Sequence, residues 1–449
     1  MDLYKRLRTK AVLHRAWARV RASGLSSTSK KTVHDTRQFE VDWFNNLQKL
    51  SKQLRLETFV FTGEKGITLP KGNGKTDVRP LVISPICNRV VRRAILEVLQ
   101  GYGEETDSPY HSWAGVQAIR HRWAGVQAVR DIMATPTSIG GIPKRGVPHG
   151  LALIRKAIQN GNHWFVRSDI KGFFTRIPKG DVNAFIRDAV NDKKFADLFE
   201  RALATNLENE EELEERKLFT LFPDPEIGVA QGSALSALAG NISLRKFDER
   251  MNCRDIHCIR YIDDFILLGP SEAKVLAAFK SAGKMLNSME MNVYDLSDTE
   301  ARKAGKVDAG NIYSGTDVLG YRVSGMSCQP CRAARRKLLE KLDAVVKDGK
   351  HEMRAAAKGN ASSHLRRYHQ SMVLLHKTVW GWSQSFKYTT AKHVFEHLDA
   401  EVDKRILCLR KEAEKLIPAG DAITHRRVMG IHLLADTGEH MLPAASLST

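Results

Sequence analysis

The sequence predicts an α+β protein in which short strands carry acidic residues and helices surround them. The stretch "CIRYIDDFILLG" (258–269) is apolar and β-prone but interrupted by two adjacent carboxylates, and "HWFVRSDIKGFF" (163–174) reads as a second strand that ends at Asp169. After Gly325 the chain becomes helical and basic as far as Ile417. Because short strands and long helices occupy separate parts of the chain, the pattern favours α+β.

Helices are expected at the start of the chain. Residues 3–23 predict one amphipathic basic helix, 23–32 a Ser-, Thr- and Lys-rich loop, and 39–55 a further helix. The apolar face of the first helix would comprise Leu3, Leu7, Val12 or Leu13, Ala16 and Val20.

Three segments follow that differ in composition. A basic, hairpin-like segment comes first, and two near-identical decapeptides then begin at His111 and His121, which we interpret as the extension of one helix. The acidic run 208–217 predicts a solvated helix face in an insertion. The last thirty residues predict a loosely packed tail.

The charge of the chain indicates a polyanionic partner. The 449 residues include 70 Lys and Arg against 51 Asp and Glu, for a formal net charge of +19 and a pI near 9.6. This length predicts two to four domains. Nucleic acid is the favoured partner, because no apolar run approaches the length of a membrane span and the basic segments extend along the whole chain.

Six cysteines are few for this length and predict reduced, cytoplasmic thiols. We also expect no secretory signal after Met1. Cys328 and Cys331 have the spacing of a zinc ligand pair, but no second Cys or His pair follows at a fitting distance, so the sequence favours structural thiols.

Asp263 and Asp264 interrupt the apolar run at a point that predicts a hairpin tip. A buried, unpaired carboxylate costs several kcal/mol. Two such charges about 4 Å apart repel by about 4 kcal/mol at an effective dielectric constant near 20, and a divalent cation would reverse the sign of that interaction. An ordinary exposed Asp-Asp turn is the alternative.

A Gly-rich entry and a helix of small residues stand between the two acidic strands, in "GVAQGSALSALAGNISLRKFDE" (228–249). Small residues let a backbone approach a ligand closely. The residues expected to pack this helix are Leu235, Leu238, Ile242 and Leu244.

The order strand-Asp, Gln-Gly helix and Tyr-x-Asp-Asp hairpin resembles motifs A, B and C of reverse transcriptases. "LPKGNGKTDVRPLVISPICNRVVRRAILEVL" and "SIGGIPKRGVPHGLALI" resemble the fingers of group II intron-type enzymes, "DVLGYRVS" the primer grip, and "TVWGWSQSFKYTTAKHVFEHLDAEVDKRI" the thumb. The resemblance implies a right-hand polymerase. Its expected parts are a basic helical extension (1–62), fingers (63–165), a palm (166–330, with an insertion at about 185–225), a helical thumb (331–417) and a tail (418–449).

The resemblance also implies the catalytic residues. Asp169, Asp263 and Asp264 would be the catalytic carboxylates and would hold two Mg²⁺ ions, with the Ile170 carbonyl as a further ligand and Mn²⁺ as a substitute metal. A lysine in "TEARKAGK", either Lys303 or Lys306, would donate a proton to pyrophosphate.

Five residues would bind the incoming dNTP. Phe174 resembles the steric gate that excludes a ribose 2′-OH, with Phe173 as the alternative. Gln231 and Gly232 resemble the floor beneath the base, while Lys71 and Arg79 resemble the cations that bind the triphosphate, with Lys75 as a rival to Lys71.

The partners implied are an RNA template, a DNA primer or product, and dNTPs, with no membrane; the sequence leaves the oligomeric state open. An A-form hybrid would be bound through its backbone and shape. The residues expected to contact nucleic acid are Arg335, Arg336, Arg366 and Arg367 of the thumb and Gly320 and Tyr321 of the primer grip.

The family pattern that fits best is a stand-alone, group II intron-like bacterial enzyme of antiphage defence that copies its own noncoding RNA. This expectation reflects Ala230 and Ala237 at family proline positions, "GVPHG" in place of an Arg-Ser stretch, and the lack of a retron-type Val-Thr-Gly element or a recognisable endonuclease after the thumb. A mobile-element reverse transcriptase and a template-independent or protein-primed polymerase of the abortive-infection type remain alternatives. An RNA-dependent RNA polymerase would have a small residue in place of Phe174.

Overall fold

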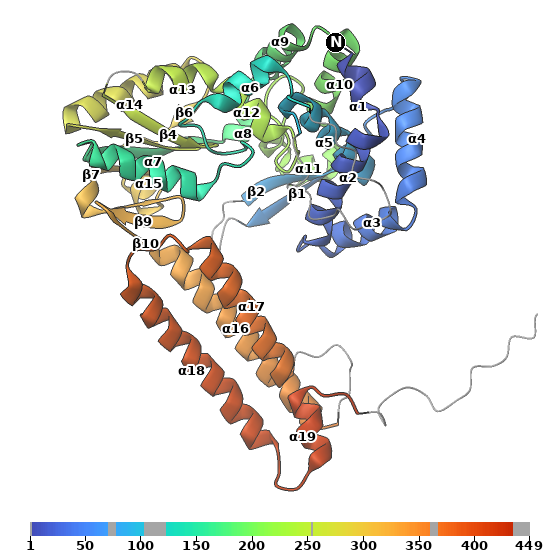
Figure 1. Ribbon diagram of the computed structural model, residues 1–449, viewed down its shortest axis with the longest axis vertical. Helices are drawn as coiled ribbons and strands as arrows, with labels where there is room; N and C mark the ends of the chain where they lie inside the picture. The colour runs from blue at the N-terminus through green and yellow to red at the C-terminus, as the bar shows by residue number, and fades with distance from the viewer. Residues whose placement is uncertain (1, 71–77, 103–122, 253–254, 360–366, 434–449) are drawn as a thin grey trace, which may run out of the picture. The chain divides into compact units, whose positions relative to one another are not determined.

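The computed structural model describes residues 2–70, 78–102, 123–252, 255–359 and 367–433. The chain divides into two compact units, Met1–Asn311 and Ile312–Thr449 (Figure 1). The predicted palm boundary at residue 330 therefore differs from the boundary of the compact unit, because the strands that follow residue 315 form a separate sheet within the second unit.

The N-terminal region consists of four helices: α1 (Leu3–Leu7), α2 (Lys10–Leu25), α3 (Lys30–Val41) and α4 (Trp43–Arg55). The predicted single helix over 3–23 is wrong because it breaks at Arg8 and Thr9, although all the apolar residues predicted for its face are buried. The predicted loop shrinks to 26–29, and the helix predicted over 39–55 is divided at Asp42.

The predicted fingers contain an antiparallel hairpin of β1 (Lys65–Pro70) and β2 (Val78–Ile83). Three helices follow, namely α5 (Ile86–Gln100), α6 (Gln127–Ala134) and α7 (Val147–Gln159). Most of the decapeptide pair lies outside the described residues, and its last part begins α6 at Gln127.

A five-stranded antiparallel sheet forms the centre of the first unit. Its order is β4 (His257–Tyr261), β5 (Asp264–Gly269), β3 (Trp164–Lys171) and β6 (Asn292–Val293), and β7 (Val307–Asn311) also pairs with β3. Strands β3 and β5 are buried along most of their length, since Phe165, Val166 and Ile266 to Leu268 are at most 3% exposed. Helix α14 (Glu272–Asn287) packs on both of these strands.

The other elements of this unit surround the sheet or follow it in sequence. They are α8 (Phe173–Arg176), α9 (Lys179–Val190), α10 (Lys193–Leu203), α11 (Glu210–Glu215), η2 (Phe219–Leu221), α12 (Ser236–Ser243), α13 (Arg245–Met251) and α15 (Thr299–Lys303). The acidic run forms the predicted solvated helix, α11, of which only Leu213 is buried. The four apolar residues predicted to pack the Gln-Gly helix are buried.

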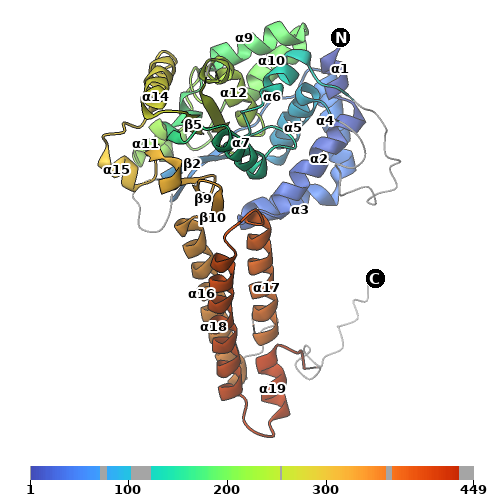
Figure 2. The same ribbon diagram turned by 60° about the vertical axis from the view of Figure 1, so that its left-hand side comes forward.

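The second unit begins with η3 (Ile312–Ser314) and a three-stranded sheet of β8 (Thr316–Val318), β9 (Tyr321–Ser324) and β10 (Ser327–Pro330). The long helices α16 (Arg332–Ala357), α17 (Tyr368–Ser385) and α18 (Lys392–Leu416) follow and lie side by side (Figures 1 and 2). Their core includes Leu338, Leu342, Leu375 and Leu409.

The predicted tail from residue 418 is wrong for its first part. Residues Ala422–Met429 form helix α19, and Val428 is fully buried in the same core as α16 and α18. Asp421 caps this helix by accepting a hydrogen bond from the Thr424 N–H. The remainder, 434–449, lies outside the described residues.

Cys328 and Cys331 are buried and form no disulfide within the described residues, and the Cys331 Sγ accepts a hydrogen bond from the Ala334 N–H at the start of α16. This contact supports the structural role predicted for them. No helix within the described residues is both long and apolar enough to span a membrane.

Candidate active site

The sheet brings the three predicted catalytic carboxylates together at one end. In the β3–β5 register Asp169 lies opposite Asp264. Asp263 occupies the turn between β4 and β5, and its carbonyl accepts a hydrogen bond of 2.9 Å from the Ile170 N–H on β3. The predicted hairpin with the Asp pair at its tip is confirmed.

The turn formed by Ile262 and Asp263, which we call the catalytic turn because of the role predicted for Asp263, has an unusual backbone. Tyr261 pairs with Asp264, so the loop consists of Ile262 and Asp263, and Ile262 has a φ of 61°. Positive φ at the first loop residue alone is the type II′ pattern, which usually requires glycine there. A β-branched residue in this conformation is strained by about 1–3 kcal/mol and persists only where surrounding contacts hold it.

A buried arginine supplies one such contact. Arg260 is 0% exposed, and one of its Nη atoms donates a hydrogen bond of 2.8 Å to the Ile262 carbonyl in the turn. Two further bonds of 2.7 and 2.6 Å reach the carboxylate of Asp248 on α13. The Nη2 atom that binds Asp248 also donates to Ser138 Oγ at 2.8 Å and Asn241 Oδ1 at 3.0 Å.

Sequence reasoning missed this network, which we call the Arg260 network (Ser138, Asn241, Asp248 and Arg260). A signal was present in the apolar run "CIRYI", which contains the charged Arg260. Like the two aspartates after it, a charged side chain in a buried strand requires a partner. Backbone pairing also joins the Ser138 segment to β4. Residues 137–139 pair with the edge of this strand, where the Ile139 N–H donates a hydrogen bond of 2.9 Å to the Arg260 carbonyl.

Two glycines allow the fingers segment to approach the catalytic turn. A Cβ added at Gly140 would lie 2.5 Å from the backbone nitrogen of Ile262. Gly141 has a φ of 72°, and a Cβ there would lie 2.5 Å from the Cβ of Ala237 on α12. The "SIGGIP" motif is therefore packed between the catalytic turn and the Gln-Gly helix.

We predict that Gly140→Ala reduces DNA synthesis by about a hundredfold, since displacement of catalytic groups by about 1 Å has effects of this size. The added methyl group must displace backbone, which cannot relax as a side-chain end can. Single-turnover primer extension would measure the effect. Gly180→Ala is the control because a Cβ there meets nothing within 4 Å; equal rates for both variants would contradict the prediction.

Two cations lie beside the carboxylates. Lys306 forms an ion pair with Asp169, and its carbonyl accepts a hydrogen bond of 3.0 Å from the Asp169 N–H. Lys303 instead pairs with Glu300 at the surface. Of the two lysines considered as a proton donor, the structure thus places Lys306 at the carboxylates. Arg167 lies 3.7 Å from Asp264 and donates a hydrogen bond of 2.7 Å to the Gly305 carbonyl.

Burial perturbs the acidity of the carboxylates. Burial, together with the charges of Asp169 and Asp263, raises the pKa of Asp264 to about 7, although Arg167 and Lys306 oppose this shift. Burial and the charge of Asp169 also raise the pKa of Asp263, while Lys306 and Arg79 lower it. Ionised carboxylates are therefore unfavourable here unless a further cation joins them.

A divalent metal fits the chemistry of this donor set. The Asp264 Oδ1 is buried and has no hydrogen-bond partner within the described part of the chain, and a carboxylate oxygen is the donor that Mg²⁺ prefers. Across the described ranges, no three His, Cys, Asp or Glu side chains already converge as a metal site. In this arrangement Lys306 supplies the positive charge beside Asp169.

The residues predicted to bind a nucleotide are only partly described. Phe173 is 2% exposed and packs against Gly240 of α12, whereas Phe174 is partly exposed. This difference favours Phe174 over Phe173 as the gate. Lys71 and its rival Lys75 lie outside the described residues, while Arg79 is exposed and acts electrostatically on Asp263.

The Gln-Gly turn contacts the fingers hairpin. The Gln231 carbonyl accepts a hydrogen bond of 3.1 Å from the Val82 N–H on β2. Gly232 is exposed and has a φ of 105°, a conformation that L side chains rarely adopt. This turn therefore offers an open backbone surface beside β2.

Several residues predicted to contact nucleic acid have structural contacts instead. Tyr321 is 1% exposed, and its hydroxyl donates a hydrogen bond of 2.9 Å to the Ser385 carbonyl, so its side chain is not available to a primer. Arg367 is 9% exposed and donates to the Arg427 carbonyl of α19 at 3.2 Å.

The other predicted contacts differ in their exposure. Arg336 is exposed beside Glu340, and Arg335 is half-buried. Gly320 has a φ of 82° at the turn before β9, and Arg366 lies outside the described residues.

Comparison with known proteins identifies the class. The model of the family "Reverse transcriptase (RNA-dependent DNA polymerase)" matches residues 69–295, which include all three carboxylates and the Arg260 network. This match covers half of the chain, so the chain belongs to the reverse transcriptase family. Its α+β fold is of the right-hand polymerase type.

Other known proteins are similar to parts of the chain. Protein YkfC of Escherichia coli K12 is 23% identical over 192 residues, which cover 42% of this chain and 40% of that protein. The structure of a partial Cas6-RT-Cas1–Cas2 complex is 19% identical, over 64% of this chain and 43% of that one, with a TM-score of 0.32. A Candida albicans telomerase structure with a telomeric RNA fragment is 9% identical, over 87% and 71%, with a TM-score of 0.38.

Proposed function

We propose that this reverse transcriptase extends a DNA strand on an RNA template by two-metal catalysis with Asp169, Asp263 and Asp264 as its ligands. The observation that supports this most directly is the position of the three carboxylates at one end of the sheet, with a buried Asp264 oxygen that has no hydrogen-bond partner among the described residues. Two bound Mg²⁺ ions would orient the reacting oxygens and neutralise the charge that develops at phosphorus.

The remaining side chains of the site would position the nucleotide. Phe174 would occupy the space of a ribose 2′-OH, and the Gln231–Gly232 turn would support the base. Arg79 would bind the triphosphate through its guanidinium, a geometry that suits phosphate oxygens. Lys306 would donate a proton to the departing pyrophosphate once a metal replaces it beside Asp169.

We predict that Phe174→Ala increases the use of ribonucleotides relative to deoxynucleotides by at least about tenfold. Removing the ring opens space for the 2′-OH, and a hydrophobic contact of this kind contributes about 1–3 kcal/mol to discrimination. Single-nucleotide incorporation with each dNTP and its NTP counterpart would measure the ratio. Phe174→Leu, which keeps an apolar side chain, is the control. An unchanged ratio would place the gate elsewhere, with Phe173 as the first candidate.

The template proposed is a dedicated, structured noncoding RNA, and the biological role proposed is antiphage defence. A net charge of +19 supports binding of a large polyanion. The role itself rests on the resemblance of the fingers and palm motifs to stand-alone, group II intron-like bacterial enzymes. A mobile-element enzyme and a template-independent or protein-primed polymerase are the competing proposals.

A single expression experiment separates these proposals. The chain is expressed in a bacterium with its native flanking DNA, challenged with a phage panel, and compared with the Asp263→Ala/Asp264→Ala variant. Protection by the wild type alone, with one RNA enriched in the purified complex and copied into DNA, would support the defence role. Equal plaque counts, or RNAs present in proportion to their abundance in the host, would contradict it. DNA product formed without any template would instead favour the template-independent alternative.

A further inference from the structure

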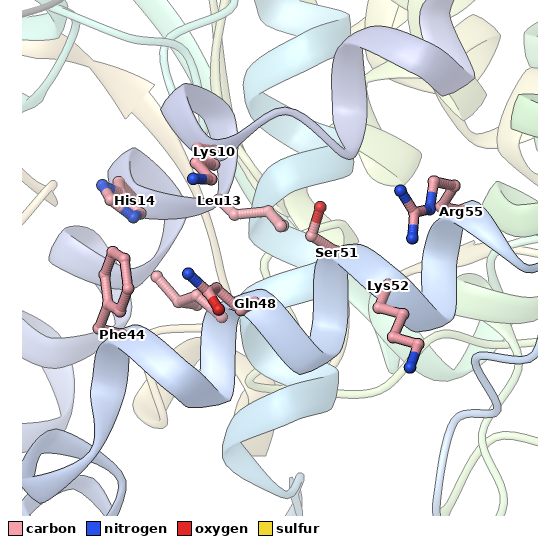
Figure 3. Close-up of a pocket in the computed structure, with 9 residues that line it drawn as sticks. Lys10, Leu13, His14, Phe44, Gln48, Ser51, Lys52 and Arg55 are labelled. Atoms are coloured by element: carbon pink, nitrogen blue, oxygen red, sulfur yellow. The ribbon is translucent and has the colours of Figure 1, made fainter.

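A cavity of about 160 Å³ lies between helices α2 and α4 in the N-terminal region (Figure 3). The buried side chains of Leu13 and Leu47 form its apolar floor. Figure 3 shows His14 and Phe44 facing each other from the two helices at one end, with Arg55 at the other. The remaining lining residues are Lys10, Gln48, Ser51 and Lys52.

The charged residues that line this cavity are all basic. Lys10, Lys52 and Arg55 are exposed and form no ion pair or side-chain hydrogen bond with any residue that the structure describes. Other exposed cations of the first unit differ, since Lys31 and Lys194 have carboxylate partners, whereas Lys30 and Lys49 form no ion pair or side-chain hydrogen bond with a described residue. Because like charges repel around the cavity, an anion bound there would stabilise the arrangement.

The cavity also offers an aromatic surface. Phe44 is 44% exposed. The His14 ring lies 5.1 Å from Trp43 and 6.4 Å from Phe44, in edge-to-face arrangements. Burial of the ring, and secondarily the charge of Lys10, lowers the pKa of His14. This shift favours the neutral form of the His14 ring. A basic groove with an exposed aromatic ring is typical of sites that bind single-stranded nucleic acid.

We propose that this cavity binds a nucleotide of single-stranded RNA. Lys10, Lys52 and Arg55 contact backbone phosphates, and the base stacks on Phe44. The inference rests on the proposed function, in which the enzyme binds a structured RNA, and assigns an unpaired segment of that RNA to a surface outside the catalytic sheet.

Fluorescence anisotropy with the full chain tests this site. The probe is a fluorescein-labelled oligouridylate of about 12 nucleotides, titrated over a series of KCl concentrations. Lys52→Gln/Arg55→Gln should weaken binding and reduce the log-log salt slope by about 0.7 for each phosphate that the variant no longer neutralises. Phe44→Ala should weaken binding about tenfold, and Phe44→Trp should retain affinity.

The matched control is Lys30→Gln/Lys49→Gln, which removes the same charge from exposed positions that do not line the cavity. Equal losses of affinity in the control and the cavity variant would overturn the site, because net charge alone would then explain them. Unchanged binding by Phe44→Ala would overturn the stacking interaction. Equal losses of affinity on an RNA duplex of the same length would overturn the preference for single strands.

Primer extension on a short, saturating template-primer separates this inference from the proposed function. The cavity variants should extend the primer at the wild-type maximal rate, because no cavity residue belongs to the catalytic sheet. A reduced maximal rate in the cavity variants, with the control variant unaffected, would overturn the assignment of these residues to RNA binding alone. If the wild type itself fails to extend a primer, the proposed function fails, and the anisotropy measurements still decide whether the cavity binds RNA.

Discussion

Replacement of Asp263 or Asp264 with alanine is expected to reduce DNA synthesis by at least about a thousandfold while RNA binding persists. In the proposed mechanism the carboxylates would contribute several kcal/mol to the stabilisation of charge through the metals they would hold, and each 1.36 kcal/mol corresponds to tenfold in rate. RNA binding depends mainly on the basic surface, which these substitutions leave unchanged. Primer extension and filter binding on the same preparations would measure both properties.

The fold of these variants is expected to be preserved. Burial already raises the pKa of both carboxylates, so removal of either one relieves an unfavourable environment. The matched control is Asp255→Ala, which removes an exposed carboxylate that pairs with Lys274. Appreciable extension by either catalytic variant, or an equal reduction in the control, would contradict the catalytic assignment.

Three strands of the central sheet, β3, β4 and β5, and their carboxylates could be predicted from sequence because their signals are local. Asp169 and the Asp263–Asp264 pair interrupt apolar, β-prone runs, and strands of this kind have few alternative arrangements. Local sequence signals could not decide whether Lys303 or Lys306 is the candidate proton donor. The choice depends on the register that brings the Lys306 carbonyl to the Asp169 N–H, a contact between residues 137 positions apart.

The errors at the helix ends have a similar origin. Helix α19 was missed because its tertiary anchor is a single buried side chain, Val428, in an otherwise polar segment. The break at Asp42 contains no Gly or Pro, so the apolar periodicity predicted one continuous helix across it.

Tyr321 and Arg367 were assigned to nucleic acid by resemblance. Their burial depends on packing against α17 and α19, which the sequence motifs do not reveal.

The Arg260 network is expected to determine both stability and catalytic geometry. Arg260→Met should destabilise the protein by about 3–5 kcal/mol, because it leaves the buried Asp248 carboxylate without its partner. DNA synthesis should fall by about a hundredfold, since the Ile262 carbonyl in the catalytic turn loses its donor and the strained turn can shift. Chemical denaturation and single-turnover primer extension would measure the two effects.

A double variant separates these two roles. Arg260→Met/Asp248→Leu removes both buried charges and should recover most of the stability, because apolar pairs of similar volume can replace buried ion pairs. Synthesis should stay low, because neither new side chain can donate a hydrogen bond to the Ile262 carbonyl. If synthesis recovers together with stability, the network only stabilises the fold. If synthesis remains low in a stable protein, Arg260 is a positioning residue that holds the Asp263 turn in its catalytic conformation.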